Sequence, residues 1–245
     1  MRCRALTTAT VLLTLSSTPA VLAQDEAVKA QPEAATGVEY VLMETSKGEI
    51  MLLLDREAAP ATVENFMAYV DDGSYDGTVF HRVIPNFMIQ GGGFDEKHDK
   101  RETRPGVANE WGNGLKNTRG AIAMARVGGQ PDSGTNQFFI NVVDNANLDR
   151  PQRDGAAYAV FGTVVDGMEV VDAIKDAPVS HQHSSDGGHH DNWPTEEVVI
   201  TKVTALTADE ATKSVPDCAT HAASWREAQA KALPGQQRMR TAVDD

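Results

Sequence analysis

The strongest signal in the chain is the stretch VFHRVIPNFMIQGGG, Val79–Gly93, which also raises the first functional question. Its apolar residues suit a buried strand, yet an arginine stands among them at position 82. Arginine is almost never fully buried without a partner, so Arg82 must either reach solvent or have a specific task. The glycines Gly91–Gly93 indicate a bulge or a tight turn rather than a phosphate-binding loop.

Strand-like runs continue on both sides of this stretch. VEYVLMETSKGEIMLLLD, from Val38, is typical of an antiparallel hairpin that turns at Ser46–Gly48. Six further runs are bounded by Gly, Pro, Asn or Asp: GTVFHRVI, FMIQGG, GAIAMAR, QFFINVV, YAVFGTVV and EEVVITKVTAL. Eight strands and few helices favour a mainly β fold, a closed antiparallel barrel. Side chains just fill the interior of such a barrel, so a ligand site is expected on its outer face.

Two amphipathic helices are predicted to cap this barrel, within residues 59–73 and 166–178, where apolar residues recur at helical spacing. An extra C-terminal helix is predicted from Asp217 to about Leu233, where Pro234 and Gly235 end it. Cys218 lies in this polar tail, which is a poor setting for a catalytic nucleophile.

The ends of the chain differ from its middle. Residues 1–23 combine two arginines, a short apolar run and small residues up to Ala23, which predicts a secretory signal peptide. We therefore divide the chain into a signal peptide (1–23), a flexible leader (24–37), a folded domain (38–206) and a C-terminal extension (207–245). The expected location is the periplasm, or the medium after secretion.

Composition excludes several classes of partner. The formal net charge is −13, so the surface should repel nucleic acid and anionic lipid. No run after the signal peptide approaches the ~18 consecutive apolar residues of a spanning helix, so membrane insertion is not expected. The G-x-S-x-G, P-loop, G-x-G-x-x-G and H-E-x-x-H motifs are absent from the sequence.

The stretch FHRVIPNFMIQGGGF resembles the central motif of the cyclophilin family of peptidyl-prolyl cis-trans isomerases. The resemblance continues in the family's order and spacing through NGLKNTRGAIAMAR, SGTNQFFINVVDNANLD and YAVFGTVVDGMEVVDAI. It covers nearly all of residues 38–206 and is strongest toward the exported cyclophilins of Gram-negative bacteria. It implies an eight-stranded antiparallel barrel closed by two helices, a folding-assisting isomerase activity and no cofactor.

The resemblance also implies the site residues. It places the catalytic arginine at Arg82 and the substrate-holding glutamine at Gln90. The substrate-binding positions that it implies are Phe87, Met88, Ala125, Phe139, Leu148 and Tyr158. The implied partners are unfolded or folding proteins with exposed X-Pro segments.

Two positions depart from the eukaryotic members of the family. Asn147 replaces an aromatic residue, so any binding of cyclosporin is expected to be weak. Arg126 follows Ala125 where an asparagine is usual.

The residue types suit the chemistry. Rotation about an X-Pro bond breaks amide resonance, against a barrier of roughly 20 kcal/mol, and needs no proton transfer or covalent bond. As the bond twists, the proline nitrogen recovers its lone pair, so a fixed donor such as Arg82 would stabilise the twisted state. An apolar pocket would hold the proline ring while Gln90 holds the neighbouring backbone. His81 has no role in such a reaction, so we interpret it as structural.

One segment outside the family core is rich in histidine. SHQHSSDGGHHDNW is predicted to form a loop, and His181, His183, His189 and His190 are candidate metal ligands. Two alternatives to an isomerase therefore stay open: a chaperone or scaffold that binds Pro-containing segments with incidental turnover, and a metal-binding protein.

Overall fold

The computed structural model describes residues 37–185 and 187–231. The predicted signal peptide and residues 24–36 of the predicted leader lie outside the described residues. So do residues 232–245, with the predicted end of the C-terminal helix. No helix in the described part of the chain combines the length and the apolar character that crossing a membrane would need.

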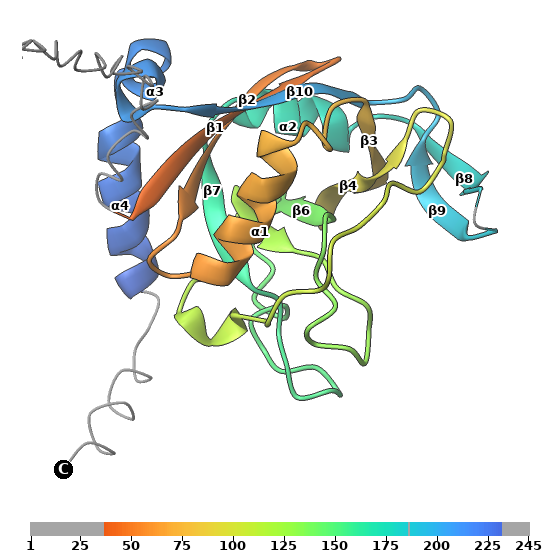
Figure 1. Ribbon diagram of the computed structural model, residues 1–245, viewed down its shortest axis with the longest axis horizontal. Helices are drawn as coiled ribbons and strands as arrows, with labels where there is room; N and C mark the ends of the chain where they lie inside the picture. Colours follow the sequence, from red (N-terminus) through yellow and green to blue (C-terminus); the bar gives the residue numbers. More distant parts are fainter. Residues whose placement is uncertain (1–36, 186, 232–245) are drawn as a thin grey trace, which may run out of the picture. The chain divides into compact units, whose positions relative to one another are not determined.

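Eight antiparallel strands close into a barrel, which confirms the predicted fold class (Figure 1). Their order around the barrel is β1-β10-β3-β4-β6-β5-β7-β2. The bounds are β1 Val38–Thr45, β2 Gly48–Asp55, β3 Thr78–Ile84, β4 Met88–Asp95, β5 Ala121–Met124, β6 Phe138–Asn141, β7 Val160–Asp166 and β10 Val199–Leu206. The hairpin of β1 and β2 turns where the sequence predicts, with Thr45 paired to Gly48.

Two helices contribute to the apolar cluster inside the barrel. In α1, Pro60–Asp71, Val63 and Phe66 are fully buried in that cluster. In α2, Met168–Lys175, Val171 and Ile174 are buried in the same cluster. Side chains therefore fill the interior, as expected for a barrel of eight strands.

A bulge in β3 determines where Arg82 lies. Phe80 pairs with Gly91 and Arg82 pairs with Gln90, so His81 is an extra residue on β3 with no partner opposite. In a regular strand, residues 80 and 82 would share a face, and Arg82 would then point into the barrel. The bulge shifts this alternation, because Phe80 and Val83 both lie in the interior cluster. Arg82 is thereby placed outside the core.

The glycines Gly91–Gly93 on the neighbouring strand β4 allow other parts of the chain to approach its backbone closely. Gly92 has φ +86°, which glycine adopts without strain. A Cβ at this position would lie 2.6 Å from the carbonyl oxygen of Asn136. The register of β3 and β4 shifts beside these glycines, so the predicted bulge is present.

The C-terminal extension forms two helices where the sequence predicts one. These are α3, Ala208–Ser214, and α4, Cys218–Lys231, which begins directly after Asp217. The missed helix α3 starts with a capping box between Thr207 and Glu210. Cys218 is fully buried against the barrel rather than lying in a polar tail, in a cluster that includes Tyr40, Met51 and Leu53.

The histidine-rich segment is an antiparallel hairpin, which corrects the prediction of a loop. Strand β8 is Val179–His183 and strand β9 is His189–Pro194, and the two form a separate sheet beside β3 (Figure 1). Trp193 anchors the hairpin: its ring is fully buried with Val79 and Phe94, and its Nε1 donates to the Glu197 carboxylate at 3.0 Å. The aromatic anchor explains why so polar a segment is ordered on the barrel surface.

Candidate active site

One hollow on the outer face of the barrel brings together all eight residues that the sequence predicts for catalysis and substrate binding. Its volume is about 130 Å³. Its lining consists of Arg82, Phe87, Met88, Gln90, Ala125, Arg126, Phe139, Leu148 and Tyr158. Strand alternation builds this lining, because Met88 and Gln90 face outward while Ile89 between them lies in the interior cluster.

The polar side of the hollow is a short chain of donors and acceptors. Arg82 Nη1 donates to Gln90 Oε1 over a long 3.4 Å, and Gln90 Nε2 donates to Gln137 Oε1 at 2.8 Å. The long contact to Gln90 is the only hydrogen bond of the Arg82 side chain within the described residues. Its guanidinium carbon lies 6.0 Å from the centre of the Phe87 ring. Gln90 is therefore held in place, while most of the Arg82 donors are available to a ligand.

The floor of the hollow is apolar and almost closed to solvent. Met88, Phe139 and Leu148 are 1%, 4% and 7% exposed, and they belong to a cluster separate from the barrel interior. The Tyr158 ring meets the Phe139 ring edge to face, with centroids 5.7 Å apart. Trp225 of α4 packs against the same cluster, so the C-terminal extension supports this floor from outside the barrel.

Arg126 is the lining residue that sequence reasoning did not assign to the site, although its departure from the family pattern was visible. Its guanidinium carbon lies 4.8 Å from the Tyr158 ring centre. Nη1 contacts Asp154 Oδ2 at 2.6 Å, Nη2 donates to the Ala156 carbonyl at 2.7 Å, and Nε donates to the Ala157 carbonyl at 3.2 Å. The Arg126 hydrogen bonds hold the pKa of Asp154 at about 2. Arg126 thus ties one wall of the hollow to the loop before β7.

His81 lies next to Arg82 in the sequence but outside this hollow. Its side chain is buried between Phe94 and Trp193, with ring centroids 4.9 Å and 5.7 Å away. Burial, reinforced by the nearby His190, lowers the pKa of His81 to about 3. A neutral, enclosed imidazole fits the interpretation of His81 as structural.

The chemistry available in the hollow is binding and electrostatic stabilisation. None of the nine lining residues is a carboxylate, a histidine or a cysteine, so the lining offers no nucleophile with an adjacent general base. It offers an apolar floor of the size of a small ring, a fixed amide and a guanidinium. A small pocket shares Arg126 with the hollow and shares Pro131 with a larger open depression of about 540 Å³, which is lined in part by Thr103, Gln130 and Ser133.

The candidate metal ligands lie elsewhere. His181, His183 and His189 are exposed on the outward face of the β8–β9 hairpin. His190 faces the other way, toward the barrel, where its ring lies 5.0 Å from Phe94 and its Nε2 contacts Ser184 Oγ at 3.0 Å. The structure therefore separates His190 from the other three histidines.

Comparison with known proteins agrees with the family resemblance of the sequence. Residues 40–205 match the family described as cyclophilin type peptidyl-prolyl cis-trans isomerase/CLD. Peptidyl-prolyl cis-trans isomerase A of Dickeya dadantii is 52% identical over 167 residues, covering 68% of this chain and 84% of that protein. Peptidyl-prolyl cis-trans isomerase B of Escherichia coli is 46% identical over 166 residues, covering 67% of this chain and 98% of the relative.

Solved structures with the same fold are more distant in sequence. The crystal structure of a cyclophilin type peptidyl-prolyl cis-trans isomerase of Cryptosporidium parvum matches with a TM-score of 0.56 and 24% identity, covering 69% of this chain and 98% of that one. A second structure of that protein, determined in the presence of the dipeptide Ala-Pro, matches with a TM-score of 0.55.

Proposed function

Since the chain belongs to the cyclophilin-type peptidyl-prolyl cis-trans isomerases, we propose that it catalyses rotation about X-Pro bonds in the hollow around Arg82. In this proposal, Arg82 stabilises the twisted amide. Peptidyl-prolyl cis-trans isomerase activity itself follows from the family and from relatives about half identical in sequence. The proposal concerns how this chain performs it and on what.

The observation that best supports the proposal is that the Arg82 guanidinium and the Gln90 amide lie next to each other beside an apolar floor. The proline ring would rest on Met88, Phe139 and Leu148, which exclude water from one side of the bond. Gln90, held by Gln137, would bind the backbone next to the proline and keep it from turning with the ring. Rotation is then confined to the X-Pro bond.

Arg82 would supply the stabilisation that distinguishes the twisted state from the planar ones. When the amide is planar, the proline nitrogen has no lone pair to offer, because resonance uses it. At about 90° of twist the nitrogen becomes an acceptor, and a donor already aimed at it binds this state best. Arginine stays protonated throughout the physiological range, so this step needs no proton transfer.

The test is Arg82→Ala, measured with a short Ala-Pro peptide. We expect kcat/KM to fall at least tenfold, about 1.4 kcal/mol of transition-state stabilisation, with an unchanged melting temperature. Arg82→Lys should rescue little, because an ammonium lacks the planar fork of donors. A matched control is Arg101→Ala, which removes another arginine whose side chain makes, among the described residues, one long hydrogen bond, 3.4 Å to the Asp76 carbonyl. Near-wild-type turnover in Arg82→Ala would refute the mechanism.

The same assay separates an isomerase from a binding module. Because Arg82 acts on the twisted state, its loss should leave peptide affinity similar in either case, so the wild-type kcat/KM is compared with a separately measured peptide Kd. If wild-type kcat/KM is low while the peptide Kd is tight, binding rather than turnover is the main activity.

The natural substrates we propose are exported proteins that fold with exposed X-Pro segments. The support is the signal-peptide pattern of residues 1–23 together with the acidic composition. Cell fractionation with mass spectrometry of the N-terminus tests it. A periplasmic or secreted protein that begins near Gln24 is expected, and a cytoplasmic protein that retains residues 1–23 would contradict it.

A further inference from the structure

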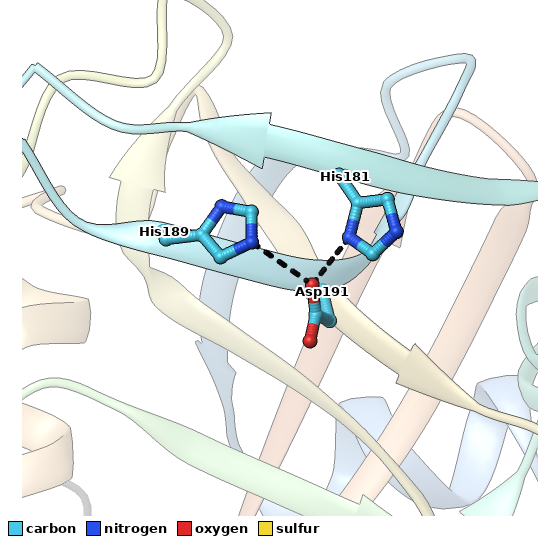
Figure 2. A group of neighbouring side chains, drawn as sticks. All are labelled: His181, His189 and Asp191. Carbon is cyan, nitrogen blue, oxygen red and sulfur yellow. Dashed lines mark hydrogen bonds and ion pairs between the residues drawn. The ribbon is translucent and has the colours of Figure 1, made fainter.

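The outward face of the β8–β9 hairpin gathers side chains that bind metal ions. His181 and His183 alternate along β8, and His189 and Asp191 alternate along β9, so all four point to the exposed side of the sheet. Figure 2 shows His181 from one strand and His189 from the other turned toward Asp191. These residues are not part of the lining of the hollow around Arg82.

The donor atoms converge on one carboxylate oxygen. His181 Nδ1 contacts Asp191 Oδ1 directly, and His189 Nε2 lies 3.4 Å from the same oxygen. The two imidazole rings are nearly parallel, at 14° and 5.6 Å between centroids. One ligand atom from each of the three residues can be chosen so that all lie within 4.8 Å of one another.

These separations are close to what a metal ion requires. Zinc binds imidazole nitrogen at about 2.0–2.1 Å in a tetrahedral site, which places neighbouring donors about 3.4 Å apart. The His189–Asp191 pair already has that separation, and the other pairs need only a small side-chain rotation. The β ladder pairs His183 with His189 and Gln182 with His190, and its register shifts at His181 and Asp191, so those two ligands lie together at a bulge between the strands.

The ligand set favours late first-row divalent cations. Two imidazoles and a carboxylate suit zinc, copper and nickel, whereas magnesium and calcium prefer oxygen ligands alone. His183 lies on the same face with its ring 5.0 Å from that of His189, so a further imidazole is close to the group. The site is exposed, so ions can enter and leave freely.

We propose that His181, His189 and Asp191 form a surface site for one divalent transition-metal ion, which bridges β8 to β9. This replaces the set expected from the sequence: Asp191 joins it, His190 leaves it, and His183 becomes a neighbour of the three ligands. The ion would cross-link the exposed face of the two strands, close to the pair formed by Ser180 and the buried Trp193. The site is independent of the isomerase mechanism.

The experiment is calorimetric titration of zinc chloride into the chain purified without an affinity tag. We expect one equivalent to bind to the wild type. His189→Ala and Asp191→Asn should each weaken that binding at least roughly 10- to 100-fold, the loss seen even when groups that merely support a ligand are removed. His221→Ala is the matched control, because His221 is an exposed histidine on α4 and its removal should change nothing.

Nickel, used as a paramagnetic probe, shows where on the chain the metal ion binds. Nuclear magnetic resonance should show amide signals of residues 179–194 broadened first. The Asp191→Asn variant keeps the shape of the side chain, so it remains informative if the histidine variant disturbs the hairpin. Absence of zinc binding, equal affinity in wild type and both hairpin variants, or broadening centred on another part of the chain would each overturn the proposal.

Discussion

His81 and Arg82 are adjacent in the sequence yet occupy opposite environments, because of the bulge in β3. His81 is enclosed by Phe94 and Trp193 under the hairpin, and its neutral form is favoured. Arg82 emerges beside the apolar floor with most of its donors available. A single unpaired residue in the ladder therefore places a basic side chain beside the hollow on the outer face of the barrel without burying its charge.

The buried His81 should make stability depend on pH. Burial lowers the pKa of His81 to about 3, whereas an unfolded histidine titrates near 6.5. Between these values the unfolded chain binds a proton that the folded chain does not, so the free energy of unfolding falls as pH drops, by up to about 1.4 kcal/mol per pH unit. The nearby His190 and Arg82 act in the same direction.

The measurement is urea unfolding of wild type and His81→Phe from pH 7 to pH 4. We expect the wild type to lose stability more steeply between pH 6.5 and pH 4, and the variant to keep only the slope due to its carboxylates. His221→Gln, at an exposed site, should follow the wild type. Parallel curves for wild type and His81→Phe would show that His81 is not buried as a neutral ring.

Cyclosporin affinity should respond to position 147, which is exposed at the loop before Leu148. The family resemblance places an aromatic residue there, and Asn147 lacks both the ring and its donor. Asn147→Trp should therefore tighten binding by roughly 2- to 10-fold, as expected for adding one aromatic contact worth about 0.5–1.5 kcal/mol. Isothermal titration decides: equal affinities in wild type and variant would show that residue 147 does not contact the ligand.

At the level of elements, the regular part of the fold could be predicted from sequence and the irregular part could not. All eight barrel strands coincide with alternating or apolar runs, and both barrel helices coincide with helical spacing. The β8–β9 hairpin was missed because its strands are polar and it is held by one buried tryptophan, Trp193, rather than by a patterned face. Helix α3 was missed although the Thr207–Glu210 capping box signals its start.

The candidate site shows the same division. Arg82, Gln90 and the apolar lining could be assigned by resemblance, and the structure places them in one hollow. The contribution of Arg126 could not be derived, because it depends on Asp154 and on carbonyls about thirty residues away in the sequence. The set His181, His189 and Asp191 likewise depends on strand pairing, which a prediction of a loop does not provide.

Helix α4 should stabilise the barrel through a specific ion pair. Arg226 donates to both oxygens of Asp55, at 2.9 and 2.8 Å, and the Asp55 side chain is only 5% exposed. Removing the Arg226 guanidinium leaves the buried Asp55 carboxylate with fewer hydrogen-bond donors. Arg226→Ala should lower the free energy of unfolding by about 1.5–3 kcal/mol, the usual worth of a hydrogen bond to a charged group.

The control lies on the same helix. Lys231 pairs with Glu227 at 2.6 Å, but both side chains are largely exposed, so Lys231→Ala should cost no more than about 0.5 kcal/mol. Urea unfolding of the two variants compares them directly. If both lower stability equally, helix α4 does not depend on the Asp55 contact.

On the scale of the whole molecule, one filled barrel carries three separate outer surfaces. The hollow around Arg82 lies over β4, β5 and β6, helices α3 and α4 cover β1, β2 and β7, and the hairpin covers β3 and β4 near Phe94. Trp225 connects two of these surfaces, because it packs against both the hollow and the cluster under α3 and α4. The surfaces can therefore carry different functions on one scaffold.

This separation leads to a prediction about metal ions and turnover. The reaction proposed for Arg82 uses a guanidinium, an amide and an apolar floor, and none of these is a good metal ligand. The metal-binding side chains lie on the face of the hairpin turned away from the barrel, whereas His190 and Trp193 on its inner side contact the bulge.

Adding EDTA, or adding zinc to saturation, should therefore change kcat/KM for an Ala-Pro peptide by less than about twofold, well under the 1.4 kcal/mol of a tenfold effect. The protease-free isomerase assay measures this on wild type and on Asp191→Asn in parallel. Loss of activity on chelation in both proteins would show that an ion bound elsewhere takes part in catalysis, whereas a loss confined to the wild type would show that the hairpin transmits metal binding to Arg82.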